Sequence, residues 1–334
     1  MYPSAEAGRA CSTGSVRITE DGQTGLVHNA DFNPALLVYD RNYQNEQGIS
    51  RTFINHLKEV REIVLRHLGN DRLVEVGCGK AFFLEMMQSS GADIRGFDPT
   101  YVGTNPAVER HNFSRATGLH AKGIILRHVL EHIQCPVDFL ADLSAANGNE
   151  GMIYIEVPCL DWICQQRAWF DIYYEHVNYF RLSDFDRMFG KVVEKGRLFG
   201  GQYLYVVADL ATIRRPRLDL NDRIAFPSDF TASIPKLDTI GATGPAVIWG
   251  GASKGVIFAL LAERAGHPFD RVIDINPAKQ GLYLAATGLK VSSPEEGLDG
   301  LPPNATIYVM NPNYIGEIRE RAGESYTYIG VGND

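Results

Sequence analysis

The feature that most constrains the fold is a unit in which an apolar segment, a glycine turn and a helical stretch follow one another. This unit occurs twice, at residues 72–89 and at residues 246–265. A strand that runs through a glycine turn into a helix is the opening half of a βαβ unit, and such units build open sheets covered by helices. The chain is therefore predicted to be an α/β protein with two sheets of this type.

Further apolar segments alternate with helical ones along the chain. The other predicted strands lie at residues 94–98, 151–158, 204–208, 271–274 and 306–310, and residues 123–133 are predicted to form a strand that runs into a helix. Ser50 is predicted to cap a helix, because apolar residues from Phe53 to Leu68 follow it at helical spacing until Gly69. The alternation predicts a doubly wound Rossmann-like sheet followed by a second, smaller Rossmann-like sheet.

The composition of the connecting stretches divides the chain into four parts. Residues 1–32 show little periodicity and are predicted to form an arm or a short hairpin. The first α/β domain is expected at residues 33–208, and the smaller domain at residues 244–334. Proline and glycine punctuate residues 209–243, which are predicted to connect the two domains.

Charge and apolar patterning exclude several classes of partner. The formal net charge is −8, and no basic stretch stands out, so nucleic acid is not an expected partner. No apolar run reaches the length of about eighteen residues that a membrane span needs. The five cysteines are scattered without a C-x-x-C pair, which disfavours a disulfide framework and a zinc site. We expect a cytoplasmic protein with reduced thiols, no metal and a small-molecule substrate, as a monomer or a homodimer.

The first glycine turn has acidic residues placed for a nucleoside ligand. Gly77 and Gly79 form the turn and let the backbone approach a ligand closely. Glu75 precedes the turn, and Asp98 ends the next strand, where a carboxylate reaches ribose hydroxyls. A dinucleotide fingerprint requires a third glycine where Phe82 stands. These residues therefore favour a cofactor that carries a ribose but no pyrophosphate.

Groups that can move protons are concentrated at residues 170–180. Glu175, His176 and the tyrosines Tyr173 and Tyr179 all lie within this segment, which follows a predicted strand. Histidine has a pKa near neutrality, so His176 is a candidate general base. The alternative is a packed aromatic patch with Glu175 and His176 at its rim.

Two histidines lie in the predicted strand-to-helix segment at residues 123–133. His128 and His132 are spaced i, i+4, so they are expected to share one face of a helix. Such a pair can bind a metal, but the sequence offers neither a third ligand beside it nor an H-E-x-x-H pattern. Metal binding is therefore not predicted, and His132 is expected to face the substrate cleft.

The combination of these segments resembles the sugar C-methyltransferase family, the S-adenosylmethionine (SAM)-dependent enzymes that alkylate carbon 3 of nucleotide-linked 4-keto-deoxysugars. The resemblance extends from residue 32 to residue 330. It rests on residues 43–47, the turn at residues 75–79, the pattern Tyr173-x-Glu175-His176-x-x-Tyr179-Phe180, and the second glycine turn with residues 274–281. The resemblance implies a class I methyltransferase fold in which SAM is bound by Glu75, Gly77, Gly79 and Asp98.

The resemblance also implies a reaction for the proton-handling segment. Methylating a carbon next to a ketone requires removing a proton from that carbon and holding the resulting enolate. His176 is expected to be the general base, with Glu175 orienting it or binding the sugar. Tyr173, together with Tyr43, is expected to donate hydrogen bonds to the enolate oxygen.

Other residues are expected to contact the acceptor. Tyr43, His132 and Tyr179 are predicted to bind the sugar portion. Ser253 and Lys254 at the second glycine turn are candidates for the phosphates of a nucleotide-linked substrate, because a helix N-terminus with a lysine is a ready anion site. The alternative is a turn without a ligand, in which Lys254 is merely exposed.

Two of the departures from the family pattern bear on the acceptor. Family members begin with a zinc-binding domain that holds four cysteines, whereas Cys11 alone precedes Cys78 here. That module is therefore expected to be absent or metal-free. A histidine usually precedes the pair that corresponds to Gly200 and Gly201, where this chain has Phe199. Both departures concern the acceptor rather than the SAM site.

Two other functions remain open. One keeps SAM but methylates oxygen or nitrogen of another natural-product intermediate, with His176 deprotonating a hydroxyl. The other is an NAD-dependent oxidoreductase that uses the second domain. Its basis is the pattern Gly250-x-Ala252-x-x-Gly255 with Asp274 downstream, which is close to the dinucleotide fingerprint.

Overall fold

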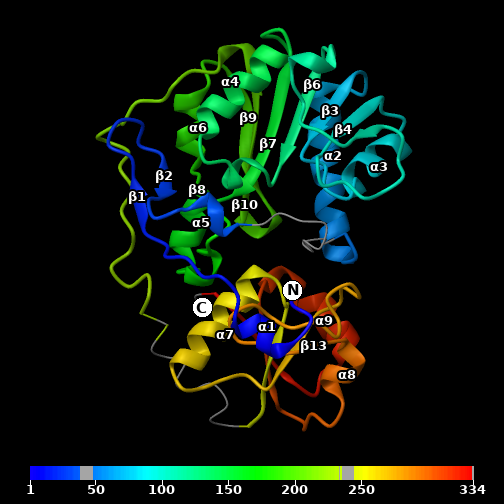
Figure 1. The fold of residues 1–334 in the computed structure, drawn as a ribbon, viewed down its shortest axis with the longest axis vertical. Coiled ribbons are helices and arrows are strands. Elements are labelled where there is room, and N and C mark those ends of the chain that lie inside the picture. The colour runs from blue at the N-terminus through cyan, green and yellow to red at the C-terminus, as the bar shows by residue number, and fades with distance from the viewer. Residues whose placement is uncertain (38–47, 233, 235–243, 333–334) are drawn as a thin grey trace.

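The computed structural model describes residues 1–37, 48–232, 234 and 244–332. These residues form two α/β units, which lie one above the other along the long axis of the molecule (Figure 1). In the described chain the upper unit contains a seven-stranded sheet and the lower unit a five-stranded sheet. The prediction of an α/β protein with two Rossmann-like sheets is confirmed, while the exact division of the chain at residues 32, 208 and 243 stays a prediction.

The first sheet has the strand order β5-β4-β3-β6-β7-β10-β9. Its strands are β3 (Leu73–Val76), β4 (Ile94–Phe97), β5 (Val108–Glu109), β6 (Gly123–Arg127), β7 (Met152–Pro158), β9 (Val192–Leu198) and β10 (Tyr203–Asp209). The first five of these run parallel, whereas β10 is antiparallel to both β7 and β9. The strand order reverses between β3 and β6, and ligands of open α/β sheets bind outside the carboxyl ends of the strands at such a point.

Helices cover both faces of the first sheet, so the sheet is doubly wound as predicted. They are α2 (Arg51–Leu68), α3 (Phe82–Ser89), α4 (Pro136–Ala146), α5 (Leu160–Gln165) and α6 (Leu182–Met188). α2 and α3 share one buried apolar cluster, and α4, α5 and α6 contribute to the other. The predicted cap is confirmed, because the side chain of Ser50 accepts a hydrogen bond from the backbone N–H of Phe53 at the start of α2.

α2 is the longest helix of the described chain, with 18 residues. It turns Lys58, Glu62 and Arg66 to the solvent and buries its apolar side against the sheet. Accordingly, none of the described helices combines the length and the apolar character needed to cross a bilayer.

Strand β9 was not predicted from the sequence. Its side chains alternate between half-buried and exposed, and the strand contains Glu194, Lys195 and Arg197. β9 lies at the edge of the sheet, beside β10. An edge strand of this kind buries too little apolar surface to produce an apolar run in the sequence.

The second sheet has the order β13-β12-β11-β14-β15, and all of its strands are parallel. The strands are β11 (Ala246–Trp249), β12 (Arg271–Ile273), β13 (Val291–Ser292), β14 (Thr306–Val309) and β15 (Thr327–Gly330), and the helices are α7 (Ser253–Arg264), α8 (Pro294–Leu298) and α9 (Ile315–Ala322). Gly255 allows α7 to pack closely on the turn, because a Cβ at this position would lie 2.0 Å from the carbonyl oxygen of Gly250.

The N-terminal residues contact both units. A short helix, α1 (Ala5–Arg9), lies on the second unit, where Gly8 packs against the backbone of Leu284. A hairpin of β1 (Ile18–Glu20) and β2 (Val27–Asn29) then pairs with β8 (Asn178–Tyr179). The arm therefore adds strands directly to the segment that carries the proton-handling residues.

Candidate functional site

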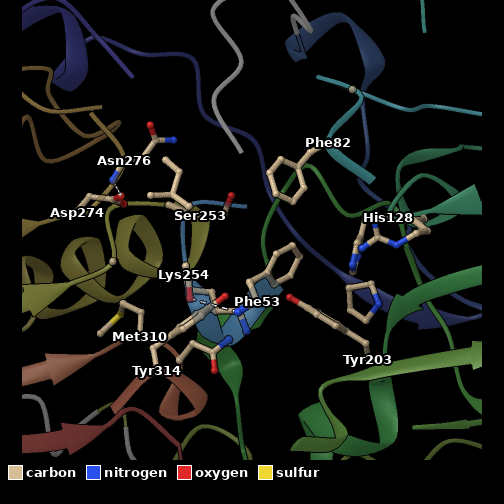
Figure 2. A pocket seen from close by; sticks show the side chains of 18 of the residues that line it. Phe53, Phe82, His128, Tyr203, Ser253, Lys254, Asp274, Asn276, Met310 and Tyr314 are labelled. Carbon is tan, nitrogen blue, oxygen red and sulfur yellow. Dashed lines mark hydrogen bonds between the residues drawn. The ribbon is translucent and has the colours of Figure 1, made fainter. Parts of the chain in front are cut away.

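A cavity of about 390 Å³ lies between the two units. Both glycine turns line it, together with Tyr173 and His176 from the loop before β8. Figure 2 shows Phe53, Phe82, His128 and Tyr203 of the first unit facing Ser253, Lys254, Asp274, Asn276, Met310 and Tyr314 of the second. The fold thus brings the predicted cofactor turn, the proton-handling segment and the predicted phosphate turn to one cavity.

The first glycine turn presents its backbone to this cavity. Gly77 and Gly79 adopt left-handed conformations, with φ of 72° and 55°. A Cβ added at Gly79 would meet no atom of the described residues within 4 Å, so the turn has room for a ligand on that side. Asp98 supports the turn, because its Oδ2 accepts the N–H of Gly79 at 2.8 Å and its Oδ1 accepts the N–H of Thr100. Asp98 itself does not belong to the described residues that line the cavity.

Glu75 lines the cavity beside the turn as a buried acid. It is 3% exposed, and its Oε2 finds no hydrogen-bond partner among the described residues. Burial, with a smaller contribution from Asp98, raises the pKa of Glu75 to about 8, although Arg127 opposes the shift. An acid with this pKa gains from a cationic or amino-bearing ligand, and the orphaned oxygen supplies an acceptor for it. The turn and Glu75 therefore fit SAM, which carries an amino group, a sulfonium and a ribose.

His176 is the buried imidazole of the site. It is 3% exposed, its Nε2 lies 2.7 Å from the hydroxyl oxygen of Tyr173, and its Nδ1 has no partner within the described chain. Burial holds the pKa of His176 well below its usual value, and the nearby His132, His128 and Lys254 lower it further. The imidazole is therefore neutral at pH 7 and has a lone pair that can accept a proton.

Glu175 and Tyr179, the other two predicted residues of this segment, lie near His176 but do not line the cavity. The backbone carbonyl of Glu175 accepts a hydrogen bond from Nδ1 of His132 at 2.9 Å. Tyr179 is buried, and its hydroxyl donates to the carbonyl of Tyr173. Neither the Glu175 nor the Tyr179 side chain is among the described groups that line the cavity, whereas His132 is. Tyr43 lies outside the described residues.

The expectation that His128 and His132 share a helix face is wrong. β6 ends at Arg127, and His128 has a left-handed backbone with φ of 51°. A short 3₁₀ helix at Leu130–His132 follows instead of an α-helix. The two imidazoles therefore point in different directions, His132 toward His176 at 5.0 Å between ring centroids and His128 toward Tyr203 at 4.6 Å.

A buried charge network behind the site was missed by sequence reasoning. Glu156 is fully buried in β7, and its Oε1 lies 3.1 Å from Nε2 of His56, 3.2 Å from Arg127 and 3.0 Å from Nε2 of His128. Its Oε2 accepts a hydrogen bond from the hydroxyl of Tyr154. The signal was present in the sequence, because a carboxylate inside an apolar parallel strand requires buried partners.

Glu131 was also missed, although it stands between the two histidines in the sequence. It is 1% exposed and lines the cavity, and its Oε1 lies 3.4 Å from Nδ1 of His128. Donor atoms of Glu131, His132 and His176 lie within 4.8 Å of one another, which is a set that can hold a metal ion. The expected absence of a metal stays a prediction.

The second glycine turn carries an ion pair between the units. Nζ of Lys254 lies 2.6 Å from Oδ2 of Asp171, which belongs to the loop of the proton-handling segment. Ser253 lines the cavity next to Lys254. The predicted phosphate turn therefore faces the cavity, with its lysine held by a buried aspartate.

Asp274 occupies the position of the ribose-binding carboxylate in a dinucleotide site. In this chain its carboxylate is bonded to neighbouring backbone N–H groups and to a lysine. Its Oδ2 accepts the N–H of Gly251 at 2.9 Å and lies 3.1 Å from Nζ of Lys279. Both oxygens of this 6% exposed carboxylate are engaged, because Oδ1 accepts the N–H of Asn276. Asp98 is engaged in the same way at the first turn, so these bonds do not decide between SAM and NAD as the ligand of either turn.

Comparisons with known proteins agree with the cofactor-side geometry. Residues 40–192 match the family model of a methyltransferase domain. A curated relative, the C-methyltransferase NovU of Streptomyces niveus, is 25% identical over 315 residues, covering 82% of this chain and 74% of the relative.

Two solved structures are similar to parts of this chain. A SAM-dependent methyltransferase from Archaeoglobus fulgidus is 16% identical with a TM-score of 0.35 and covers 48% of this chain and 100% of its own. The plantazolicin methyltransferase BpumL in complex with S-adenosylhomocysteine is 16% identical with a TM-score of 0.37, covering 52% of this chain and 88% of its own. The prediction that the chain is an enzyme that transfers methyl groups from SAM is confirmed by the family model and the curated relative.

The raised pKa of Glu75 predicts that SAM affinity depends on pH. At pH 6.5 the carboxyl is protonated, and a cationic ligand must displace that proton. SAM affinity should therefore rise about tenfold per pH unit up to about pH 8 and then level off. The Glu75→Gln variant should bind SAM more weakly and without this slope. Isothermal titration across pH measures both, and an equal slope in the two proteins would contradict the assignment.

Proposed function

We propose that this SAM-dependent methyltransferase methylates a carbon next to a carbonyl group, in a nucleotide-linked deoxysugar or a related small metabolite. The observation that carries the proposal is that one cavity contains the cofactor turn with Gly77 and Gly79, the buried imidazole of His176 and the turn with Lys254. The relative from Streptomyces niveus is a C-methyltransferase, which supports carbon as the acceptor atom.

In this proposal the chain's own residues carry out the proton chemistry. SAM, when bound, supplies an electrophilic methyl group. Neutral His176 accepts the proton from the carbon next to the carbonyl, and the electron pair of the broken C–H bond moves to the carbonyl oxygen. Nδ1 of His176, which has no partner among the described residues, is the accepting nitrogen. The Nε2–H donates to the hydroxyl oxygen of Tyr173 at 2.7 Å, so the Tyr173 hydroxyl hydrogen can be donated to the carbonyl oxygen in the cavity.

His132 and the second turn bind the acceptor in the same proposal. His132 lines the cavity next to His176, where it meets the sugar. Ser253 and Lys254 lie at the N-terminus of α7, which favours anions. A diphosphate arriving there competes with Asp171 for Lys254, so substrate binding exchanges one anion for another at this lysine.

The Lys254→Ala variant tests the phosphate role. Loss of a charge-assisted hydrogen bond costs about 1.5–3 kcal/mol, so KM for a nucleotide-linked substrate should rise about 10- to 100-fold. The change in kcat should be smaller, because Lys254 does not act on the reacting carbon. Lys290→Ala is the matched control, since Lys290 is exposed and paired with Glu296. An unchanged KM in Lys254→Ala would remove the phosphate role.

The proposed reaction is tested with SAM and a thymidine diphosphate-linked 4-keto-6-deoxyhexose. Mass spectrometry should show the gain of one methyl group, and NMR should place it on the carbon beside the ketone. Without SAM, the protein in D₂O should exchange the hydrogen on that carbon. Methylation of oxygen or nitrogen without such exchange would instead identify the alternative acceptor class.

The NAD-dependent alternative is separated by binding alone. Isothermal titration should show SAM binding and no NAD binding, since the family model and the curated relative that match this chain are both methyltransferases. Tight NAD binding without SAM binding would overturn the proposal.

A further inference from the structure

We propose that Glu131, rather than Glu175, is the carboxylate that positions His176 and stabilises its protonated form during proton abstraction. This inference rests on the proposed base role of His176. It adds a positioning residue that the comparisons do not name and that the sequence pattern did not reveal. It also explains why Oε2 of Glu131 and Nδ1 of His176 are buried without a hydrogen-bond partner among the described residues.

The first argument is the pair of orphaned atoms. Oε2 of Glu131 and Nδ1 of His176 are both buried, and neither has a hydrogen-bond partner in the described part of the chain. The two side chains are 1% and 3% exposed, and both line the cavity. Their donor atoms belong to a cluster whose members lie within 4.8 Å of one another. A carboxylate oxygen of Glu131 and a ring nitrogen of His176 thus lie within 4.8 Å of each other, near enough for the carboxylate to stabilise the imidazole once it gains a proton.

The second argument is that backbone hydrogen bonds set the separation of the two residues. The N–H of Val177, next to His176, donates to the carbonyl of Glu131 at 2.8 Å. The side-chain amide of Asn178 donates to the carbonyl of Ile133 at 2.6 Å. On its other side, the carbonyl of Val177 accepts the N–H of Asn29 at 2.8 Å, from the N-terminal hairpin. The base-bearing segment is thus held between the hairpin and the Glu131 loop.

The third argument concerns Glu175, the neighbour that sequence reasoning favoured. Its backbone carbonyl accepts the hydrogen bond of His132. Its side chain is half-buried and is not one of the described groups that line the cavity. The carboxylate that shares the cavity with His176 is therefore the one on the facing loop.

The charges around His176 show why it needs a carboxylate. The nearby His132 and His128 of the loop after β6 and Lys254 of α7 all lower the pKa of His176, so each disfavours a second positive charge there. Tyr173 and Tyr179 on its own segment contribute rings and hydroxyls without charge. Asp171 is bonded to Lys254. Oε1 of Glu131 already lies 3.4 Å from Nδ1 of His128, and its second oxygen, Oε2, provides the counter-charge for an imidazolium at position 176.

The isosteric variant Glu131→Gln removes the charge and keeps the size of the side chain. An opposite charge within about 4–6 Å shifts a pKa by about 1–3 units, so the variant should lower the imidazole pKa of His176 by that amount. NMR of ¹³C-histidine-labelled protein, saturated with S-adenosylhomocysteine, measures this pKa, and His176→Gln identifies the resonance. Glu150→Gln is the matched control, because Glu150 is an exposed partner of His120 on the surface. This measurement does not depend on the acceptor, so it separates this inference from the proposed reaction.

Kinetics then distinguish positioning from mere structural support. With the keto-sugar nucleotide, Glu131→Gln should lose at least about tenfold in kcat with little change in KM for SAM. The acid limb of its kcat profile should move to lower pH by the shift that NMR measures. Glu131→Asp keeps the charge at a longer distance and should recover part of both effects.

Three results would overturn the inference. The first is a His176 pKa in Glu131→Gln within about 0.3 units of wild type, well below the expected shift. The second is a loss of kcat with an unmoved acid limb. The third is stoichiometric Zn²⁺ binding by wild type that Glu131→Gln abolishes, because Glu131 would then be a metal ligand.

Discussion

Replacing His176 by glutamine is expected to reduce methyl transfer by about 10²- to 10⁴-fold, the usual contribution of a positioned general base. Glutamine fills a similar volume and can still hydrogen-bond to Tyr173, but it cannot accept a proton from carbon. The loss should appear in kcat and, in D₂O without SAM, in the exchange of the substrate hydrogen. Affinity for SAM should stay within about threefold, because the cofactor turn is built by other residues.

The matched control for this variant is His120→Gln. His120 is an exposed histidine that contacts Glu150 on the surface, far along the chain from the cavity residues of the loop before β8. Its replacement should leave both kcat and exchange unchanged. A wild-type rate of hydrogen exchange at the substrate carbon in His176→Gln would contradict the base role of His176. Tyr173, which is bonded to His176, would then be the remaining candidate proton acceptor.

The glycine turns made the fold predictable from the sequence. Apolar parallel strands such as Leu73–Val76 and Ala246–Trp249 are buried along their whole length, so they leave apolar runs that end in glycine. β9 left no such run, because Glu194, Lys195 and Arg197 interrupt it and none of its residues is fully buried. Short strands such as β5 and β13 pair over two residues each, which is too little to produce a pattern.

The site was only partly predictable, because its chemistry depends on residues that local patterns misplace. His128 was expected on a helix, but the strand β6 ends one residue earlier and the backbone turns left-handed there. That turn points the imidazole at Glu156 instead of along a helix face. Glu175 and Glu131 could not be ranked from the sequence, because which carboxylate faces His176 depends on how two distant loops pair.

The buried network around Glu156 leads to the largest stability prediction. Glu156→Gln keeps the side-chain volume but leaves Arg127 and His128 without their shared counter-charge. Removing one partner of a buried ion pair costs about 3–5 kcal/mol, so the free energy of unfolding at pH 7 should fall by that amount. Urea denaturation measures it. The control is Glu62→Gln, which removes an exposed partner of Arg61 and should cost less than about 1 kcal/mol.

The same network fixes the sign of a pH dependence. Burial alone would lower the pKa of His128, but Glu131 and Glu156 raise it from the usual 6.5 to about 9. The folded protein therefore keeps a proton that the unfolded chain releases above pH 6.5, and stability should fall by about 3 kcal/mol as pH rises from 6.5 to 9. Arg127 and His56 hold the pKa of Glu156 well below 4.5, so its contribution is present above that pH and is lost as pH falls through the folded-state value. In Glu156→Gln the alkaline slope should flatten, since His128 loses one of its two carboxylates. An equally steep slope in that variant would show that another group releases the proton.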